Sequence, residues 1–328
     1  MSGYMRKSLA AALLVFGLLA PLAAAQSGTF DAQTIYGRAV AAVATIRVQG
    51  SRGTSVGTGF LIDRGLVLTA AHVARTAESI VVEFNDTQVS DARVVGYDAR
   101  RDVAALRLVS GVGATPLELV DSDSVQTGDP VVVIGTPRGM PRVMTTGEVR
   151  ATNVTFPGLV PRIMIFFDAG VAPGNSGGPL LNAQGQVIGV VVAGTTRGDG
   201  GGLAVSGSTV KNALPVITGG TRVERAWMGI TGTGLTADLA RQRRLTVDHG
   251  ILLLEILPGG PADLAGLRGA VSEGPPGDVI TSINGDPIDE WEDLLDFLAT
   301  REPGQRLRLG VVRGSDRYSV TLVLGARP

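Results

Sequence analysis

The chain has 328 residues, enough for two or three domains at roughly 100–200 residues each. Hydrophobic residues make up 44% and charged residues 18%, a composition that can bury a real core and argues against long disorder. The formal net charge is −1, from 29 basic and 30 acidic residues without a long basic run, so the electrostatic footprint of a nucleic-acid-binding protein is missing. The absence of cysteine excludes a disulfide framework, zinc–cysteine sites and thiol catalysis.

The first 25 residues have the pattern of a secretory signal peptide. Arg6 and Lys7 precede an apolar run over residues 9–22, and three alanines at 23–25 supply an A-x-A cleavage site ahead of Gln26. An uncleaved anchor is the alternative, since about 18 apolar residues can just span a bilayer. We expect an exported protein of the bacterial periplasm or cell envelope, which touches the membrane only if this segment stays uncleaved.

From Val43 onward, short apolar runs rich in β-branched residues recur between turn residues. The clearest are 44–48, 59–62, 66–68, 80–84, 104–108, 131–134, 163–167 and 187–192. Such spacing is typical of β-sandwiches and β-barrels, and no alternation of strands and helices indicates a parallel sheet. Residues 26–45 are alanine-rich with weak helical spacing, which predicts a helix leading into the first strand.

A second unit begins near Gly219 and Gly220. Its apolar runs predict strands at 227–230, 250–257, 278–284, 306–313 and 318–324. Residues 289–298 read as a helix with Asp289 as the N-cap, and 261–267 as a shorter helical stretch. We therefore expect a small half-open barrel with two helices. The predicted organisation is a signal peptide at 1–25, a first domain at 26–220 and a second at 221–328.

A glycine-rich turn around Ser176 is the first candidate for chemistry. A serine hydroxyl needs a base to take its proton and backbone N–H groups aimed at the developing oxyanion. Glycines on both sides of Ser176 allow a turn tight enough to present both, with Gly174 and Ser176 as the natural N–H donors. The alternative is an ordinary glycine-rich turn with a capping serine.

The base must be a histidine, and the chain has two. His72 follows a strand and a corner of small residues, whereas His249 lies in a turn of the second unit, where a surface position is expected. The orienting carboxylate should lie beside the histidine and accept its Nδ1–H. Asp102, directly before the strand at 103–106, is the best candidate, and Asp98 remains an alternative that could instead cap a turn. The order His72, Asp102, Ser176 is the chymotrypsin order.

Three segments around these residues resemble the catalytic blocks of the HtrA (Deg) family: 69–73, 98–104 and 174–180. Residues 57–60 resemble the family's strand before the histidine block, and the resemblance extends over residues 35–325. It implies a mainly β protein, with a chymotrypsin-like serine protease domain of two six-stranded β-barrels followed by one PDZ domain. It also implies ATP-independent cleavage of unfolded or exposed polypeptides, a role in protein quality control, and a homotrimer.

The resemblance also assigns a peptide site in the second unit. Residues 227–230 resemble the PDZ carboxylate-binding loop, so the backbone N–H groups of Met228, Gly229 and Ile230 are expected to hold a peptide C-terminus. The peptide would add as a strand beside 230–231, with the 289–298 helix as the other wall unless that helix only packs the core. In the first domain, Gly170 stands six residues before Ser176, where a trypsin-like enzyme carries an acidic pocket floor, so small aliphatic P1 residues are expected.

The chain departs from the family in three places. The segment 268–276 is longer than usual, residues 195–202 are unusually rich in glycine, and Arg150 is the nearest counterpart of a sensor arginine that the family carries near Val154. Peptide-triggered activation therefore stays open, and the alternative function is a catalytically weak peptide-binding sensor or chaperone that keeps the protease fold. No cofactor is expected, because neither tetrahedral metal ligands nor a phosphate-binding loop can be read from the sequence.

Overall fold

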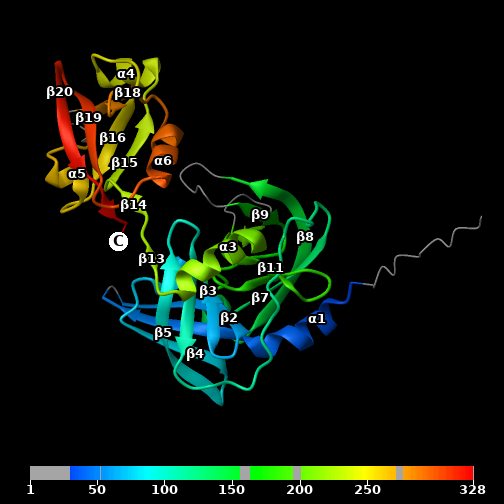
Figure 1. Ribbon diagram of the computed structural model, residues 1–328. Helices are drawn as coiled ribbons and strands as arrows, with labels where there is room; N and C mark the ends of the chain where they lie inside the picture. The colour runs from blue at the N-terminus through cyan, green and yellow to red at the C-terminus, as the bar shows by residue number, and fades with distance from the viewer. Residues whose placement is uncertain (1–29, 52, 156–162, 195–200, 271–275, 328) are drawn as a thin grey trace, which may run out of the picture. The chain divides into compact units, whose positions relative to one another are not determined.

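The computed structural model describes residues 30–51, 53–155, 163–194, 201–270 and 276–327 (Figure 1). The predicted signal peptide lies outside these ranges, as do parts of two of the segments where the chain departs from the HtrA pattern, 195–202 and 268–276. Within the ranges, no helix combines the length and the apolar character needed to cross a membrane.

The first barrel consists of six antiparallel strands, β1 (Val43–Gly50), β2 (Gly53–Asp63), β3 (Leu66–Thr69), β4 (Ser79–Asn85), β5 (Gln88–Asp98) and β6 (Val103–Leu108). They are paired in the order β5-β4-β1-β2-β3-β6, and pairing between β5 and β6 closes the ring. A short strand, β13 (Arg222–Val223), adds in parallel to β5. Valine, isoleucine and leucine fill the interior because β-branched and large apolar side chains fit a pleated, buried surface.

The second barrel is closed as well, in the order β10-β11-β12-β9-β8-β7. Its strands are β7 (Pro130–Gly135), β8 (Val143–Val154), β9 (Met164–Phe167), β10 (Pro179–Leu181), β11 (Val187–Gly194) and β12 (Gly202–Ser206). The pairing of β10 with β7 matters for the site, because β10 directly follows the glycine-rich turn around Ser176. This turn is therefore anchored to the barrel wall at its exit.

Four helical segments accompany β1–β7, two of them 3₁₀ helices: α1 (Ala32–Ala39), η1 (Val40–Ala42), α2 (Ala71–Ala74) and η2 (Pro137–Gly139). The helix predicted before the first strand is α1, and the carboxylate of Asp31 caps it by accepting from the amides of Gln33 and Thr34. A further helix, α3 (Gly207–Thr218), was not predicted. Its sequence contains Pro215 and β-branched residues of low helix propensity, but Ser206 caps its start and an apolar face is buried.

The PDZ-like unit contains a main sheet in the order β15-β16-β17-β19-β20, with the short β18 beside β17. These strands are β15 (Ile230–Gly234), β16 (Ile251–Ile256), β17 (Val279–Ile283), β18 (Asp286–Pro287), β19 (Arg306–Arg313) and β20 (Asp316–Val323). A separate pair joins β14 (Ala226–Trp227) to β21 (Gly325–Ala326). Leucine, isoleucine and valine side chains form the hydrophobic core of this unit.

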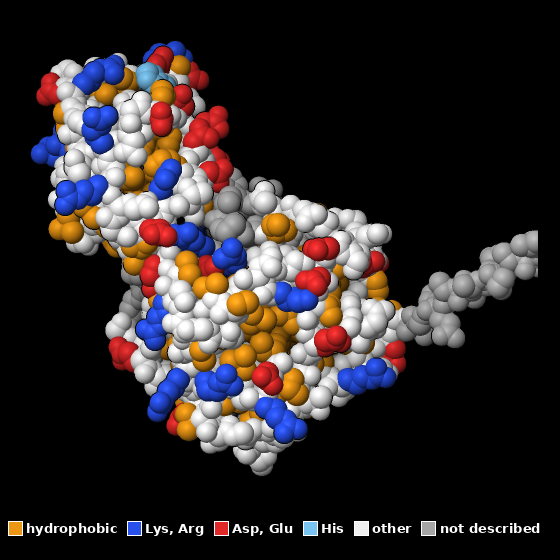
Figure 2. Space-filling view, in the orientation of Figure 1, with side chains coloured by type: hydrophobic (Ala, Val, Ile, Leu, Met, Phe, Trp, Pro, Cys, Tyr) orange, Lys and Arg blue, Asp and Glu red, His pale blue; other side chains and the backbone are white. Residues whose placement is uncertain are grey.

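The two helices expected in this unit are α5 (Pro261–Leu264) and α6 (Trp291–Ala299), and α4 (Ala237–Arg243) is a third. The N-cap prediction for α6 was wrong. The helix begins two residues later than expected, with Glu290 at the N-cap and no side-chain hydrogen bond there, so Asp289 does not cap it. Buried Leu294 fixes which face of α6 turns to the core. On the face of the molecule shown in Figure 2, acidic and basic side chains are interspersed.

Gly96 in β5 provides a test of how closely the first barrel is packed. A Cβ at this position would lie 2.3 Å from the carbonyl oxygen of Ile217 and 2.4 Å from that of Thr221, both of which belong to the backbone around the end of α3. We expect Gly96→Ala to lower the free energy of unfolding by about 1–3 kcal/mol, because backbone must move to make room.

Urea denaturation followed by circular dichroism measures this change. Gly111→Ala is the matched control, because a Cβ there meets nothing within 4 Å; its effect should stay within about 0.5 kcal/mol. Equal stability of the two variants would contradict the close packing of β5 against this backbone.

Candidate active site

His72 is positioned by the end of β3 and the single turn of α2. Ala70 and Ala71, which precede His72, are fully buried. The imidazole of His72 itself stays partly open to solvent. The backbone amide of His72 donates to Oδ1 of Asp102 at 2.9 Å, and Nδ1 of the ring lies 2.8 Å from Oδ2. Since a carboxylate only accepts, Nδ1 carries the proton and Nε2 is left as the proton acceptor.

The structure separates the two candidate carboxylates. Asp102 directs both oxygens at His72, whereas Asp98 accepts the amides of Arg100 and Arg101 at 2.9 and 3.0 Å and pairs with the Arg101 guanidinium. Asp98 therefore caps the turn that leads to Asp102. At the end of this turn Asp102 has φ = +61°, a left-handed conformation that is rare outside glycine and that needs surrounding contacts to persist.

The turn around Ser176 depends on two glycines in left-handed conformations, Gly174 at φ = +103° and Gly177 at φ = +88°. A Cβ on Gly177 would lie 2.1 Å from the carbonyl oxygen of Thr58 and 2.9 Å from the amide of Ala70. The turn is thus pressed against the segment that leads to His72, and only glycine fits there.

The hydroxyl of Ser176 is not hydrogen-bonded to His72 within the described part of the chain. Its Oγ donates instead to the carbonyl oxygen of Val192, at 3.4 Å. Hydrogen bonds of this kind are often long or misaligned before substrate binds, so the separation leaves the nucleophile assignment untouched. The structure thus places His72 and Asp102 in direct contact, whereas the Ser176 hydroxyl contacts β11.

Three carbonyl groups of the turn around Ser176 each accept a hydrogen bond. Pro173 O accepts from the Arg138 amide at 2.9 Å, Gly174 O from the Thr58 hydroxyl at 2.7 Å, and Asn175 O from the Gly178 amide at 3.0 Å. In a trans peptide the N–H points opposite to the C=O. The carbonyls of Pro173 and Asn175 therefore set the directions of the Gly174 and Ser176 amides.

These two amides make no hydrogen bond among the residues that the structure describes, whereas those of Asn175, Gly177 and Gly178 all do. Unbonded, converging N–H groups are what an oxyanion hole requires. The sequence predicted the same pair of donors, but it did not identify the Arg138 and Gly178 amides that hold the carbonyls behind them. Arg138 acts through its main chain, which its side-chain type does not reveal.

The surroundings of the expected P1 pocket are apolar. Gly170 carries no side chain, and a Cβ on Gly202 would lie 2.5 Å from both Val171 Cγ2 and the Phe167 ring. Asp168, at the end of β9, is engaged elsewhere: its Oδ1 accepts from the Glu148 amide at 2.7 Å, and its Oδ2 from Nε of Arg150 at 2.7 Å. The amide hydrogen bond and then the guanidinium hold the pKa of Asp168 below its ordinary value.

The PDZ-type loop shows the same backbone design as the serine turn. Met228 O accepts from the Ala262 amide and Gly229 O from the Leu257 amide, both at 2.8 Å, so the amides of Gly229 and Ile230 point away from α5 and β16. Gly229 has φ = +79°. His249 is exposed in this unit and bonds to its neighbour Asp248, as expected for a surface residue.

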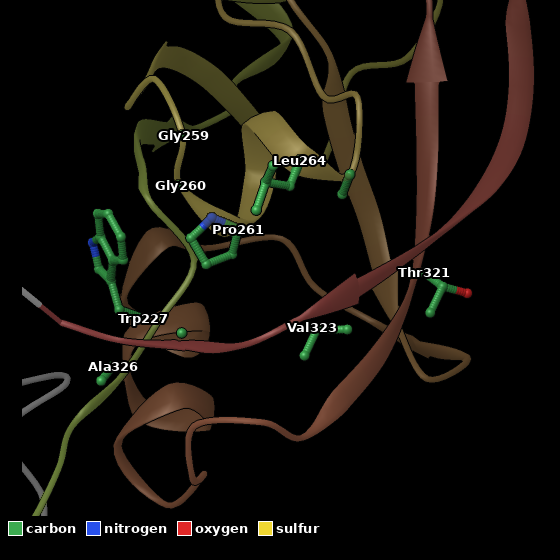
Figure 3. A pocket seen from close by; sticks show the side chains of 10 residues that line it. Trp227, Gly259, Gly260, Pro261, Leu264, Thr321, Val323 and Ala326 are labelled. Carbon is green, nitrogen blue, oxygen red and sulfur yellow. The ribbon is translucent and has the colours of Figure 1, made fainter.

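Trp227 packs against Gly229 of this loop. Figure 3 shows its indole next to Pro261, with Leu264 beyond, at a pocket of about 480 Å³ between α5 and the β20–β21 segment. The indole also lies 3.2 Å from where a Cβ on Gly229 would be. The ring therefore fixes the loop, and this pocket is separate from the amides of Gly229 and Ile230. Among the residues the structure covers, no cluster of three acidic or histidine side chains could hold a metal ion.

Two family models match the chain, a trypsin-like peptidase domain over residues 57–190 and a PDZ domain over 220–312. The chain is 33% identical over 277 residues to the periplasmic pH-dependent serine endoprotease DegQ of Escherichia coli K12, covering 82% of this chain and 59% of DegQ. It is 34% identical over 285 residues to the periplasmic serine endoprotease DegP of the same strain, covering 84% and 58%. The chain thus spans less than two thirds of the length of these relatives.

Solved structures give matches over nearly their whole length. The HtrA-type protease AlgW with a tripeptide is 30% identical with a TM-score of 0.55, covering 91% of this chain and 98% of AlgW. The serine endoprotease from Yersinia pestis is 25% identical with a TM-score of 0.56, again covering 91% of this chain and 98% of the other.

The turn capped by Asp98 can be tested independently of any activity. Asp98→Ala removes the acceptor of two amides and a buried ion-pair partner, so the free energy of unfolding should fall by about 1–3 kcal/mol. The exposed Asp91 on the same strand is the control, and Asp91→Ala should change stability by less than about 0.5 kcal/mol in the same urea titration. If both variants unfold at the same midpoint, Asp98 does not hold the turn.

Proposed function

The chain belongs to the HtrA (Deg) family of trypsin-like serine proteases with one C-terminal PDZ domain, and we propose that it is an ATP-independent serine endopeptidase of the bacterial cell envelope. Its substrates are unfolded or exposed polypeptides, which makes it a protein quality-control enzyme. The observation that carries the proposal is the His72–Asp102 pair beside a turn whose Gly174 and Ser176 amides are unbonded.

Each residue of the site has one role in the proposed reaction. His72 Nε2 takes the proton of the Ser176 hydroxyl as Oγ attacks the scissile carbonyl carbon, and Asp102 holds the ring in the tautomer that allows this. The amides of Gly174 and Ser176 donate to the oxyanion of the tetrahedral intermediate. His72 then returns the proton to the leaving amine, and water hydrolyses the acyl-enzyme by the same steps with water as nucleophile.

We propose a preference for small aliphatic P1 side chains such as valine, alanine and isoleucine. Gly170 supplies no acidic side chain, Val171 and Phe167 beside Gly202 are apolar, and Asp168 is bound to Arg150 and the Glu148 amide. An apolar pocket of this kind discriminates weakly, by about 1–3 kcal/mol per methylene-sized difference. A broad range of polypeptides therefore serves as substrate.

The remaining assignments follow the family. Residues 1–25 direct export, residues 26–220 form the protease domain, and residues 221–328 form the PDZ domain. The PDZ domain binds peptide C-termini through the amides of Met228, Gly229 and Ile230, and the protein assembles as a homotrimer. The relatives' description as periplasmic and the peptide complex of AlgW support these proposals.

A second function has one observation in its favour. The Ser176 hydroxyl points to Val192 O and is not bonded to His72 in the described part of the chain, as in a protease held at rest. On this alternative the protein is a peptide-binding sensor or chaperone with weak catalysis. Reaction of Ser176 with a fluorophosphonate probe distinguishes the two functions.

Cleavage of unfolded β-casein tests the nucleophile. The purified chain, produced with its own N-terminal segment, should cleave casein and bind the probe, whereas Ser176→Ala should lose several orders of magnitude of rate and all labelling. Ser110→Ala, at an exposed serine, is the control and should keep wild-type activity. Equal cleavage by Ser176→Ala would show that Ser176 is not the nucleophile, and a wild type that takes up no probe would favour the sensor.

Peptide binding tests the loop at Gly229. Because Gly229 is left-handed and packed against Trp227, Gly229→Ala should weaken binding of a decapeptide with a free C-terminal valine by about 5- to 30-fold, about 1–2 kcal/mol. Gly314→Ala is the matched control: its φ is also positive, at +62°, but a Cβ there meets nothing within 4 Å. Fluorescence anisotropy with the free and the C-terminally amidated peptide gives the readout. Equal affinity for both peptides would sink the carboxylate assignment.

A further inference from the structure

Three threonine hydroxyls are buried beneath the proposed catalytic residues. Thr69 ends β3, Thr58 lies in β2, and Thr136 lies between β7 and η2; all three are fully buried. Thr58 and Thr69 belong to the first barrel and Thr136 to the second, so the group lies where the barrels meet. A buried hydroxyl without partners would cost about 1–3 kcal/mol, and each of these finds them.

The hydrogen bonds form one connected chain. Thr69 Oγ1 donates to the carbonyl oxygen of Thr58 at 2.7 Å. Thr58 Oγ1 accepts from the Thr136 amide at 2.9 Å and lies 3.0 Å from Thr136 Oγ1. Thr136 Oγ1 in turn donates to Gly57 O at 3.2 Å. The single hydroxyl proton of Thr58 is therefore free for one further acceptor, and that acceptor is Gly174 O at 2.7 Å.

Thr58 contacts the serine turn twice. Its hydroxyl holds Gly174 O, and its backbone amide donates to Ser176 O at 2.8 Å. Gly174 O belongs to the peptide that joins residues 174 and 175, and Ser176 O to the peptide that joins residues 176 and 177, so both of these peptides are held by one residue of the opposite barrel. The peptide that joins residues 173 and 174 is held separately, by the Arg138 amide on Pro173 O.

We propose that Thr58 is a positioning residue of the oxyanion hole, acting through its hydroxyl. Gly174 has no Cβ to restrict it and has φ = +103°, so its conformation depends on the two planes that flank it. The Arg138 amide fixes the first plane and the Thr58 hydroxyl the second. Together they hold Gly174 in the conformation in which its N–H, which lies in the first plane, faces the substrate oxyanion. The inference rests on the proposed function, since an oxyanion hole has meaning only for acyl transfer.

The effect should fall on the transition state and spare substrate binding. Thr58→Val keeps the shape of the side chain and removes the hydroxyl, so Gly174 O loses its donor and the peptide that joins residues 174 and 175, which lies between the two donor amides, is no longer held. A misplacement of this kind costs about 100-fold in kcat. KM for a casein-derived peptide should change less than about 3-fold, because the hole contacts the oxyanion and not the bound side chains. Affinity for a peptide aldehyde, which forms a tetrahedral adduct on serine, should fall in parallel with kcat.

Two further variants separate positioning from folding. Thr58→Ser keeps the hydroxyl and should restore kcat to within about 3-fold of wild type. Thr136→Val removes a hydroxyl of the same buried chain but leaves the bond from Thr58 to Gly174 O, and it too should stay within about 3-fold. If Thr58→Val does not fold, Thr58→Cys supplies a side chain of similar size with a weak donor, and its kcat should fall about 10-fold.

The outcomes are distinguishable. Loss of kcat and of aldehyde affinity in Thr58→Val, with KM kept and Thr58→Ser active, supports the proposal. Equal loss in Thr136→Val and Thr58→Val would reduce Thr58 to a general packing role and overturn it. Wild-type kcat in Thr58→Val, with wild-type enzyme active and labelled by fluorophosphonate, would overturn the role of Thr58 alone. A wild type that neither cleaves nor takes up the probe would overturn the proposed function and this inference together.

Discussion

The two elements proposed to bind anions, the serine turn and the PDZ loop, depend on one property of the trans peptide: the carbonyl oxygen and the amide hydrogen point in opposite directions. In the serine turn, bonds to Pro173 O and Asn175 O direct the amides of Gly174 and Ser176. In the PDZ loop, bonds to Met228 O and Gly229 O direct the next two amides in the same way. Each element needs a left-handed glycine, because the carbonyls can be held inward only where the chain reverses sharply. Neither arrangement relies on a charged side chain to orient its donors.

Contacts with the backbone also explain how residues from the two barrels are combined in one site. His72 and Asp102 come from the first barrel and Ser176 from the second, yet the turn that carries Ser176 is held by Thr58 of the first barrel. Gly177 leaves no space between the turn and the segment before His72. The relative placement of nucleophile and base is thus set by backbone contacts at the barrel junction, where packed atoms leave little freedom.

Much of the architecture was predictable because its signals are local. Short apolar runs rich in β-branched residues predicted the strands, and glycines around Ser176 predicted a turn with exposed amides. Longer-range features were not accessible in this way. Helix α3 contains Pro215 and poor helix formers, and it persists because one face is buried on the barrels. The start of α6 was placed at Asp289 from capping preference alone, whereas the backbone becomes helical only after Glu290. Contacts such as the hydrogen bond from the Arg138 amide to Pro173 O involve only main-chain atoms, so the residue types do not reveal them.

The sequence favoured Asp102 as the orienting carboxylate and left Asp98 as an alternative that could cap a turn, and the geometry gives the physical reason for two aspartates so close together. Asp102 directs one oxygen at the ring of His72 and the other at its backbone amide, and its own backbone is left-handed. A second carboxylate can stabilise such a turn if it precedes the turn, because its oxygens then reach the amides that follow. Asp98 lies at this position and accepts hydrogen bonds from the amides of Arg100 and Arg101. Asp98 therefore shapes the turn, and the turn directs the carboxylate of Asp102 at His72.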